Sequence, residues 1–134
     1  MFGIGELSKR TGCNIETIRF YEKNGLLPPP PRTAGGHRLY NDRHLQQLAF
    51  IVQARSLGFS LDHTRSLLAL SKDTNKTCGD TLEMVGDQLD LVKTKIRALN
   101  EIKSSLEKLE NDCRCCAPGT KAPECTVLGS FYQA

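Results

Sequence analysis

The chain has 134 residues, a length that suits one small domain or a small domain with an extension. No apolar run is long enough to span a bilayer, and the first residues, MFGIGELSKR, lack the apolar core of a signal peptide. We therefore expect a cytoplasmic protein with no membrane partner. Residues 1–70 carry nine Lys/Arg against five Asp/Glu, a balance of +4, whereas residues 71–134 carry nine against ten. The first half is thus the part suited to a polyanion such as nucleic acid.

Two short helices are predicted at the start of the chain. The first covers IGELSKR (residues 4–10), and Gly12 can take the left-handed conformation that turns the chain after it. Asn14 is a good N-cap for the second helix, which should end at Asn24 and Gly25. Such a pair is either an ordinary helical hairpin or a helix-turn-helix, whose second helix enters the major groove of DNA.

The following stretch, LLPPPPRTAGGHRLYND, favours the helix-turn-helix. Its four prolines exclude a helix, and Gly35-Gly36 permits a tight turn, so a loop or small hairpin is predicted. Side chains of the types that contact phosphates are concentrated in it, at Arg32, His37, Arg38 and Tyr40. On the second helix, Thr17, Arg19 and Tyr21 are expected to point away from the core. A basic wing beside a recognition helix is therefore predicted.

Two further helices are expected to supply the core. Asn41 should cap the third helix and Gly58 should end it; its apolar stripe is Leu45, Leu48, Ala49 and Val52. Ser60 should cap the fourth, which carries Leu61, Leu67, Leu68 and Leu70.

A long helix is predicted after Cys78. Its apolar residues recur at steps of three and four: Leu82, Val85, Leu89, Val92, Ile96, Leu99, Ile102, Leu106 and Leu109. This is a heptad seam with one irregularity, and a lone helix of this length would expose it. The simplest partner is the same helix of a second chain, which predicts a homodimer. Packing on the third and fourth helices of the same chain is expected at one end only.

The chain has six cysteines, most of them clustered near its end, which are candidate metal ligands. Four lie in NDCRCCAPGTKAPEC, at Cys113, Cys115, Cys116 and Cys125, where Pro118, Gly119 and Pro123 can fold the loop back. A short terminal helix or turn should follow. Thiolates without histidine favour soft ions such as Zn(II), Cd(II), Hg(II), Pb(II) or Cu(I). Cys13, in the first turn, is expected to be a small buried apolar residue.

The position of Cys78 bears on how such an ion would be held. Cys78 and Cys113 are 35 residues apart on one predicted helix, which places them about 50 Å apart. They cannot share a metal within one chain. An antiparallel helix pair would bring Cys78 of one subunit beside Cys113 of the other, giving two equivalent sites, one at each end of the dimer.

The first half of the chain closely resembles the DNA-binding domain of the MerR family of transcription regulators. The resemblance rests on IGELSKRTG, TIRFYEKNGLL, the R-x-x-x-G-x-R-x-Y wing and the LGFSL turn. It implies a homodimer that binds a double-stranded promoter operator, distorts the DNA and acts on RNA polymerase there. By motif match the DNA contacts would be Thr17, Arg19, Tyr21, Arg32, His37, Arg38 and Tyr40. His37 is a departure, since many members carry Tyr at this position.

The metal-sensing branch of this family supplies a sharper expectation. A cysteine at the start of the dimerisation helix, as Cys78 here, resembles the sensors of divalent ions. The interval to Cys113 resembles the mercury sensor, whereas Cys115-Cys116 followed by Cys125 resembles the zinc sensor loop, which also expects a histidine that this loop lacks. Cys78, Cys113 and Cys125 are thus the first candidate ligands, with Cys115 and Cys116 as replacements or ligands of a second ion. The effector would be Hg, Cd, Pb or Zn.

Other functions stay open on the same fold. Four loop cysteines could hold an iron–sulfur cluster or act as a thiol redox sensor, a Cu(I) sensor is a further alternative, and a purely structural zinc site is the simplest one. An enzyme is not expected, because no catalytic Cys/His pairing is evident. The fold class predicted is mainly α: a winged helix-turn-helix domain (1–70), a linker and dimerisation helix in an antiparallel coiled coil (71–112), and a cysteine-rich loop with a terminal turn or helix (113–134).

Overall fold

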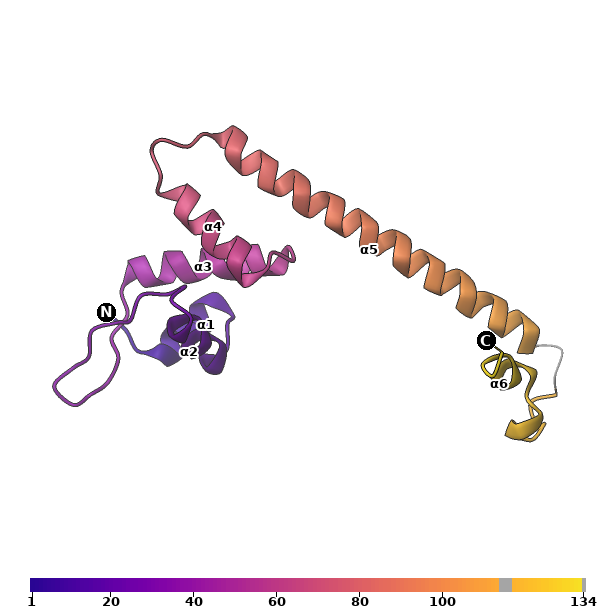
Figure 1. The fold of residues 1–134 in the computed structure, drawn as a ribbon. Helices are drawn as coiled ribbons and strands as arrows, with labels where there is room; N and C mark the ends of the chain where they lie inside the picture. The colour runs from indigo at the N-terminus through magenta and orange to yellow at the C-terminus, as the bar shows by residue number, and fades with distance from the viewer. Residues whose placement is uncertain (114–116, 134) are drawn as a thin grey trace. The chain divides into compact units, whose positions relative to one another are not determined.

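The computed structural model describes residues 1–113 and 117–133. The predicted mainly helical fold is confirmed. The α-helices are α1 (Ile4–Thr11), α2 (Ile15–Lys23), α3 (Asp42–Ser56), α4 (Leu61–Ser71), α5 (Cys78–Cys113) and α6 (Thr126–Ser130), with a 3-10 turn η1 (Ala122–Glu124) before α6 (Figure 1). Two compact units result, Met1–Val85 and Gly86–Ala134. Within the described residues no helix has the length and apolar content needed to cross a membrane.

The predicted caps are confirmed. Asn14 accepts a hydrogen bond from the Thr17 N–H at 2.8 Å, and Ser60 accepts one from the His63 N–H at 3.1 Å. At α3 the Asn41 side chain accepts from the His44 N–H, while the His44 ring accepts from the Asn41 N–H, a reciprocal capping box. These side chains satisfy backbone donors that each helix start would otherwise leave unpaired, which fixes where each helix begins.

The core of the first unit lies where α1 packs on α2 and α3, and where α3 packs on α4. Its fully buried side chains are Leu7, Ile18, Leu26, Leu27, Tyr40, Leu48 and Ile51. Cys13 is 8% exposed, which confirms its expected place in the core. One expectation for α3 is wrong: Ala49 is exposed, and the buried face instead runs through Leu48, Ile51 and Ala54. His44, four positions before Leu48, is also buried on this face.

The burial of His44 predicts a pH-dependent stability for this unit. Burial lowers the pKa of His44 below its ordinary value of 6.5, and the nearby Glu22 carboxylate opposes that shift only partly. As pH falls through about 6.5, the unfolded chain binds a proton that the folded chain does not. We therefore expect the free energy of unfolding, measured in urea, to decrease from about pH 6.5 downward until the lower folded-state pKa is passed.

The substitution His44→Gln should flatten this part of the pH profile, because glutamine keeps a capping-box side chain without titrating. His63→Gln is the matched control, since His63 is exposed on α4. Equal pH profiles for the parent and His44→Gln would contradict the assignment.

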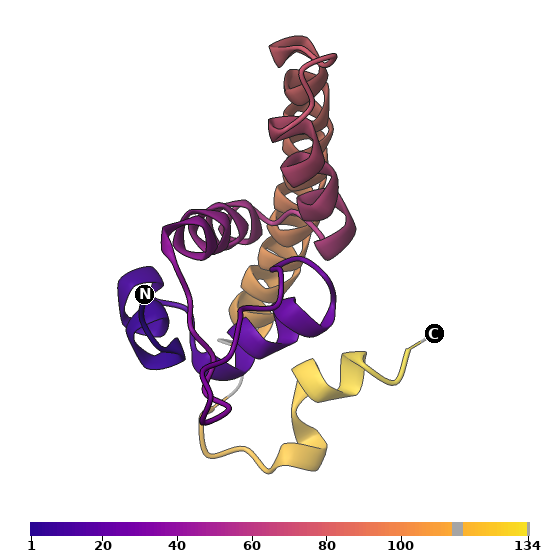
Figure 2. The same cartoon turned by 90° about the vertical axis from the view of Figure 1, so that its left-hand side faces the viewer.

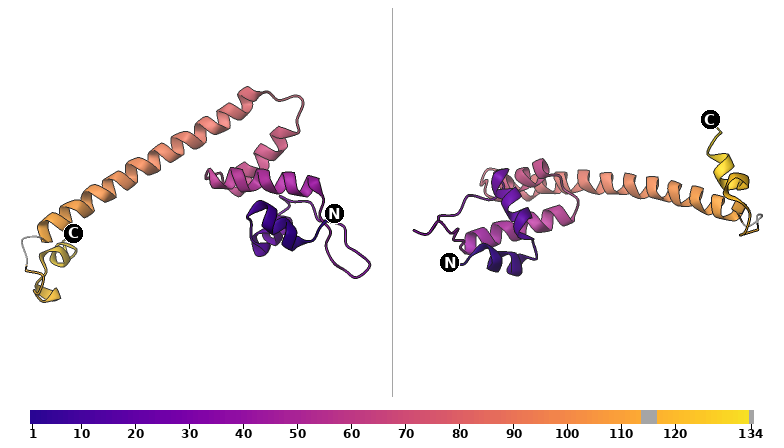
Figure 3. Two further views of the ribbon diagram at one scale, coloured as in Figure 1. Left: turned by 180° about the vertical axis from the view of Figure 1, so that it is seen from behind. Right: turned by 90° about the horizontal axis from the view of Figure 1, so that it is seen from below.

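Helix α5 is one uninterrupted helix of 36 residues (Figure 3). The carboxylate of Asp80 holds its first turn, accepting from the Thr77 N–H at 2.8 Å and the Thr77 hydroxyl at 3.3 Å. Met84 packs against Ala54, Phe59 and Leu67, which confirms the expectation that α5 packs within its own chain at one end. Most of the other apolar side chains of α5 are exposed: Leu82, Val85, Leu89, Leu91, Ile96, Leu99, Ile102 and Leu106. Val92 and Leu109 are half-buried.

The second unit contains the remainder of α5, followed by η1 and α6 (Figure 2). The predicted terminal helix is thus confirmed as α6. Leu128 in α6, and Phe131 and Tyr132 directly after it, are exposed.

Candidate nucleic-acid interface and metal centre

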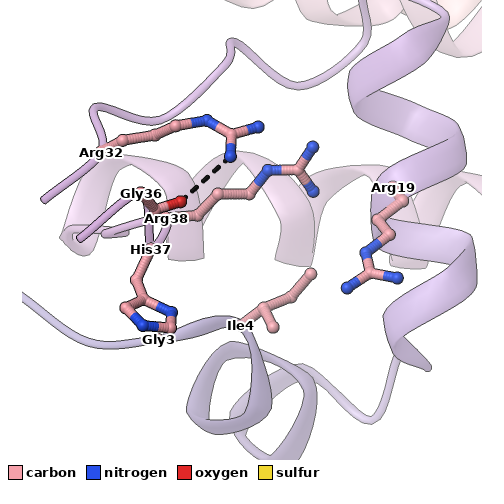
Figure 4. A pocket seen from close by; sticks show the side chains of 7 residues that line it. All are labelled: Gly3, Ile4, Arg19, Arg32, Gly36, His37 and Arg38. Atoms are coloured by element: carbon pink, nitrogen blue, oxygen red, sulfur yellow. Dashed lines mark hydrogen bonds between the residues drawn. The ribbon is translucent and has the colours of Figure 1, made fainter.

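A basic hollow lies between the recognition helix and the wing. It has a volume of about 650 Å3 and is lined by Gly3, Ile4, Arg19, Arg32, Gly36, His37 and Arg38 (Figure 4). Arg19 extends into it from α2, and Arg32 and Arg38 extend from the wing on the opposite side. Four of the seven predicted DNA contacts therefore meet at one surface. A concave cationic surface with three guanidinium groups is suited to a nucleic-acid backbone.

The wing is a short hairpin held at both ends. At its base the backbones of Phe2 and Tyr40 exchange two hydrogen bonds, at 2.9 and 2.8 Å. Toward its tip Arg32 and Arg38 face one another across the hairpin, and the Arg32 guanidinium donates to the Gly36 carbonyl at 3.0 Å. Gly36 has a positive φ of 82°, a conformation that suits glycine and allows this tight reversal. The hairpin thus fixes the backbone positions of Arg32 and Arg38.

Two of the predicted contacts are buried. Tyr21 is 7% exposed, so the expectation that it points away from the core is wrong. Tyr40 is fully buried, and its hydroxyl donates a hydrogen bond to the Glu22 carboxylate. Burial and this hydrogen bond raise the pKa of Tyr40 well above its ordinary value. Both tyrosines pack the recognition helix and the wing base; contact of their hydroxyls with DNA stays a prediction.

Sequence reasoning missed one residue of this site, Glu22. Its carboxylate lies 3.5 Å from the Arg38 guanidinium and also accepts from Tyr40, and its side chain is 8% exposed. The available signal was an acidic residue on a helix expected to face DNA. Sequence spacing alone could not pair Glu22 with Arg38, sixteen positions further along, because it does not give the path of the wing.

Arg19 offers a direct test of the interface. Its side chain is exposed on α2 and faces the hollow, while Thr17 beside it is half-buried. We expect Arg19→Ala to weaken operator binding by about 1–3 kcal/mol, roughly 5- to 150-fold, with metal binding unchanged. Fluorescence anisotropy with a labelled duplex would measure it. Lys103→Ala on α5 removes the same charge outside the hollow, and an equal loss in that control would refute a specific role for Arg19.

The cysteines are distributed over two units. Cys78 is exposed at the first residue of α5, Cys113 is the last residue of the same helix, and Cys125 is half-buried directly before α6. The predicted ligands Cys115 and Cys116 lie outside the described residues. Among the residues that are described, no three His, Cys, Asp or Glu side chains form a metal-binding group.

The donor chemistry nevertheless suits a soft ion. Cys78 sits in the first turn of a long helix, where the dipole favours negative charge. At 1.5 Å per residue, the 36 residues of α5 span about 54 Å, so its two terminal cysteines cannot share an ion in one chain. Sulfur ligands select Zn(II), Cd(II), Hg(II), Pb(II) or Cu(I) over hard cations.

Two family models match the helix-turn-helix part of the chain and most of α5. Residues 2–70 match the family described as MerR HTH family regulatory protein, and residues 45–109 match the one described as MerR, DNA binding. Together the two matches extend from the first helix to near the end of α5.

Three similar proteins illustrate the match. The chain is 39% identical to the HTH-type transcriptional regulator ZntR of Escherichia coli K12, with 99% of this chain and 94% of that protein covered. It is 37% identical to PbrR691 of Ralstonia metallidurans CH34, whose crystal structure is in complex with lead(II), with a TM-score of 0.81 and coverage of 98% and 99%. It is 29% identical to a MerR of Bacillus megaterium MB1 in complex with mercury(II), with a TM-score of 0.70 and coverage of 98% and 100%.

Proposed function

Because this chain belongs to the MerR family of helix-turn-helix transcription regulators, we propose that it is a metal-responsive activator of a resistance or efflux promoter. The effector is a divalent thiophilic ion, Hg, Cd, Pb or Zn. The protein acts as a homodimer on double-stranded operator DNA, with RNA polymerase as its partner at the promoter. The lead and mercury complexes of similar chains support a soft divalent effector.

One observation carries the proposal. Helix α5 begins at Cys78 and ends at Cys113, and between them it exposes an unpaired apolar stripe. A second α5 packed antiparallel would cover the stripe and place Cys78 of one subunit at the end where its partner carries Cys113 and Cys125. Cys78 at the helix start would otherwise have no evident chemical task. The proposal therefore places one ion at each end of the dimer.

The same arrangement provides a mechanism for the response. The thiolates of the two subunits hold the ion and thereby favour one orientation of the two DNA-binding units over another. Both forms hold the operator through the basic hollow, and the change in orientation bends or untwists the DNA between the half-sites. Transcription then changes through the energy of DNA deformation, without new base contacts.

An anaerobic titration of the fully reduced protein tests the metal. Thiolate-to-metal charge transfer follows Cd(II), Hg(II), Pb(II) and Cu(I) directly, and the spectroscopically silent Zn(II) enters by competition against Cd(II). Saturation by a divalent ion at one ion for each subunit supports the proposal. Tight binding of Cu(I) alone would assign the loop to a monovalent-ion sensor. A brown protein that contains iron and sulfide would assign it to an iron–sulfur redox sensor.

A further inference from the structure

We propose that Glu22 is a positioning residue for DNA binding, which holds Arg38 of the wing in place from the recognition helix. The proposal goes beyond the metal response and depends only on the DNA binding of the family. It rests on the contacts of the Glu22 carboxylate with Arg38 and Tyr40 of the wing. It thus assigns a role in DNA binding to a residue with the same charge as the DNA backbone.

Both oxygens of the Glu22 carboxylate are used. Oε1 accepts the hydrogen bond from the Tyr40 hydroxyl, and Oε2 lies 3.5 Å from Nη1 of Arg38. Tyr40 is fully buried and Glu22 nearly so, whereas the Arg38 side chain remains 30% exposed. The carboxylate is therefore oriented from the buried side and presents its second oxygen to the guanidinium. Arg38 cannot swing freely into solvent while this contact holds.

The geometry of arginine explains how the contact serves binding. The guanidinium is planar and carries five N–H donors, so one side can face a carboxylate while the other side donates to a phosphate. Arg38 lines the basic hollow together with Arg19, which extends from the same helix that carries Glu22 (Figure 4). Glu22 thereby connects α2, which carries Arg19, to the wing, which carries Arg38. The Arg38 side chain is ordered before DNA binds, so binding loses less conformational entropy.

Simple electrostatics and a positioning role predict opposite changes in DNA affinity when the charge of Glu22 is removed. If Glu22 only repels phosphates, Glu22→Gln should tighten DNA binding. If it positions Arg38, the same substitution should weaken binding although it removes a negative charge. Glutamine keeps the shape and retains an oxygen that can accept from the Tyr40 hydroxyl, so the packing of the wing base is preserved.

The experiment measures the affinity of the full chain for a duplex that the unaltered protein selects from a random-sequence pool, over a series of salt concentrations. Glu22→Gln should weaken binding about tenfold and reduce the slope of log K against log salt by about one phosphate contact. Glu16→Gln is the matched control, because Glu16 is exposed on the same helix and has no ion pair in the described structure. It should bind as the parent or slightly tighter.

A double-mutant cycle separates positioning from a general loss of structure. In an Arg38→Ala background, Glu22→Gln should cause no further loss of affinity, because the residue that it positions is already absent. Binding by Glu22→Gln equal to or tighter than the parent would overturn the proposal. So would a tenfold loss that persists in the Arg38→Ala background, since that result would show a structural effect independent of Arg38. The metal titration above is unaffected by either outcome, so failure here leaves the proposed sensor function standing.

Discussion

Replacing Ile96 by glutamate should leave the protein monomeric at micromolar concentration and nearly abolish operator binding. Ile96 lies in the middle of the exposed stripe of α5 and is 51% exposed in the single chain. In the proposed dimer it would be covered, and an unpaired charge buried there costs about 3–5 kcal/mol. This free energy corresponds to an increase of at least about two orders of magnitude in the dissociation constant of the dimer. Sedimentation equilibrium would measure the mass, and a gel-shift assay would measure the affinity for the operator.

Ala98→Glu is the control for this substitution. It introduces the same charge two residues away, at an exposed position that is not part of the apolar stripe. We expect this variant to remain dimeric. A dimeric Ile96→Glu would contradict the pairing of the α5 helices through this stripe, whereas loss of the dimer in both variants would indicate that helix stability and not the seam is responsible.

The second large effect is expected at Cys78. Cys78→Ser should lower the affinity for the divalent effector by about 100-fold or more, because one of three thiolates is replaced by a poor ligand for soft ions. Operator affinity without metal should stay nearly unchanged, since Cys78 lies outside the basic hollow. A reporter fused to the promoter, assayed over a series of metal concentrations, would measure the loss of induction.

Cys13→Ala is the matched control for the thiol count, because Cys13 is buried in the DNA-binding unit and belongs to no proposed metal site. Induction of the reporter by Cys78→Ser at the parent's metal concentrations would refute a ligand role for Cys78. Loss of operator binding by Cys78→Ser would instead indicate that the start of α5 supports the fold of the first unit.

Much of the fold could be predicted because the local signals are strong. Asn14, Asn41 and Ser60 each stand immediately before an amphipathic run, and each caps a helix as expected. The four prolines after α2 exclude a helix and Gly35-Gly36 permits a tight turn, so a loop or small hairpin between α2 and α3 was predictable from sterics. The apolar stripe of α5 was predictable because its residues recur at steps of three and four. Local rules suffice wherever a residue interacts within about four positions of itself.

Most of the errors concern residues whose partners are distant in sequence, and one concerns a helix face. The outward orientation expected for Tyr21 is wrong because Tyr21 lies three positions from the buried Ile18 and so shares its helix face. Ala49 was placed in the core because it is apolar, whereas the packing of α3 on α1 and α4 decided which face is buried. The contacts of Glu22 with Arg38 and Tyr40 depend on the path of the wing, which no local pattern specifies.

The burial of Cys13 has a consequence for the reactivity of the reduced protein. Desolvation raises the pKa of its thiol, so the nucleophilic thiolate is scarce as long as the first unit stays folded. Cys78, in contrast, is exposed at the start of α5. An alkylating reagent should therefore distinguish these two thiols, because Cys78 can react in the native protein whereas Cys13 reacts only when the helix-turn-helix opens. With reagent concentrated enough that alkylation outpaces reclosing, the rate at which Cys13 is modified measures how often the DNA-binding unit unfolds under native conditions, without any denaturant.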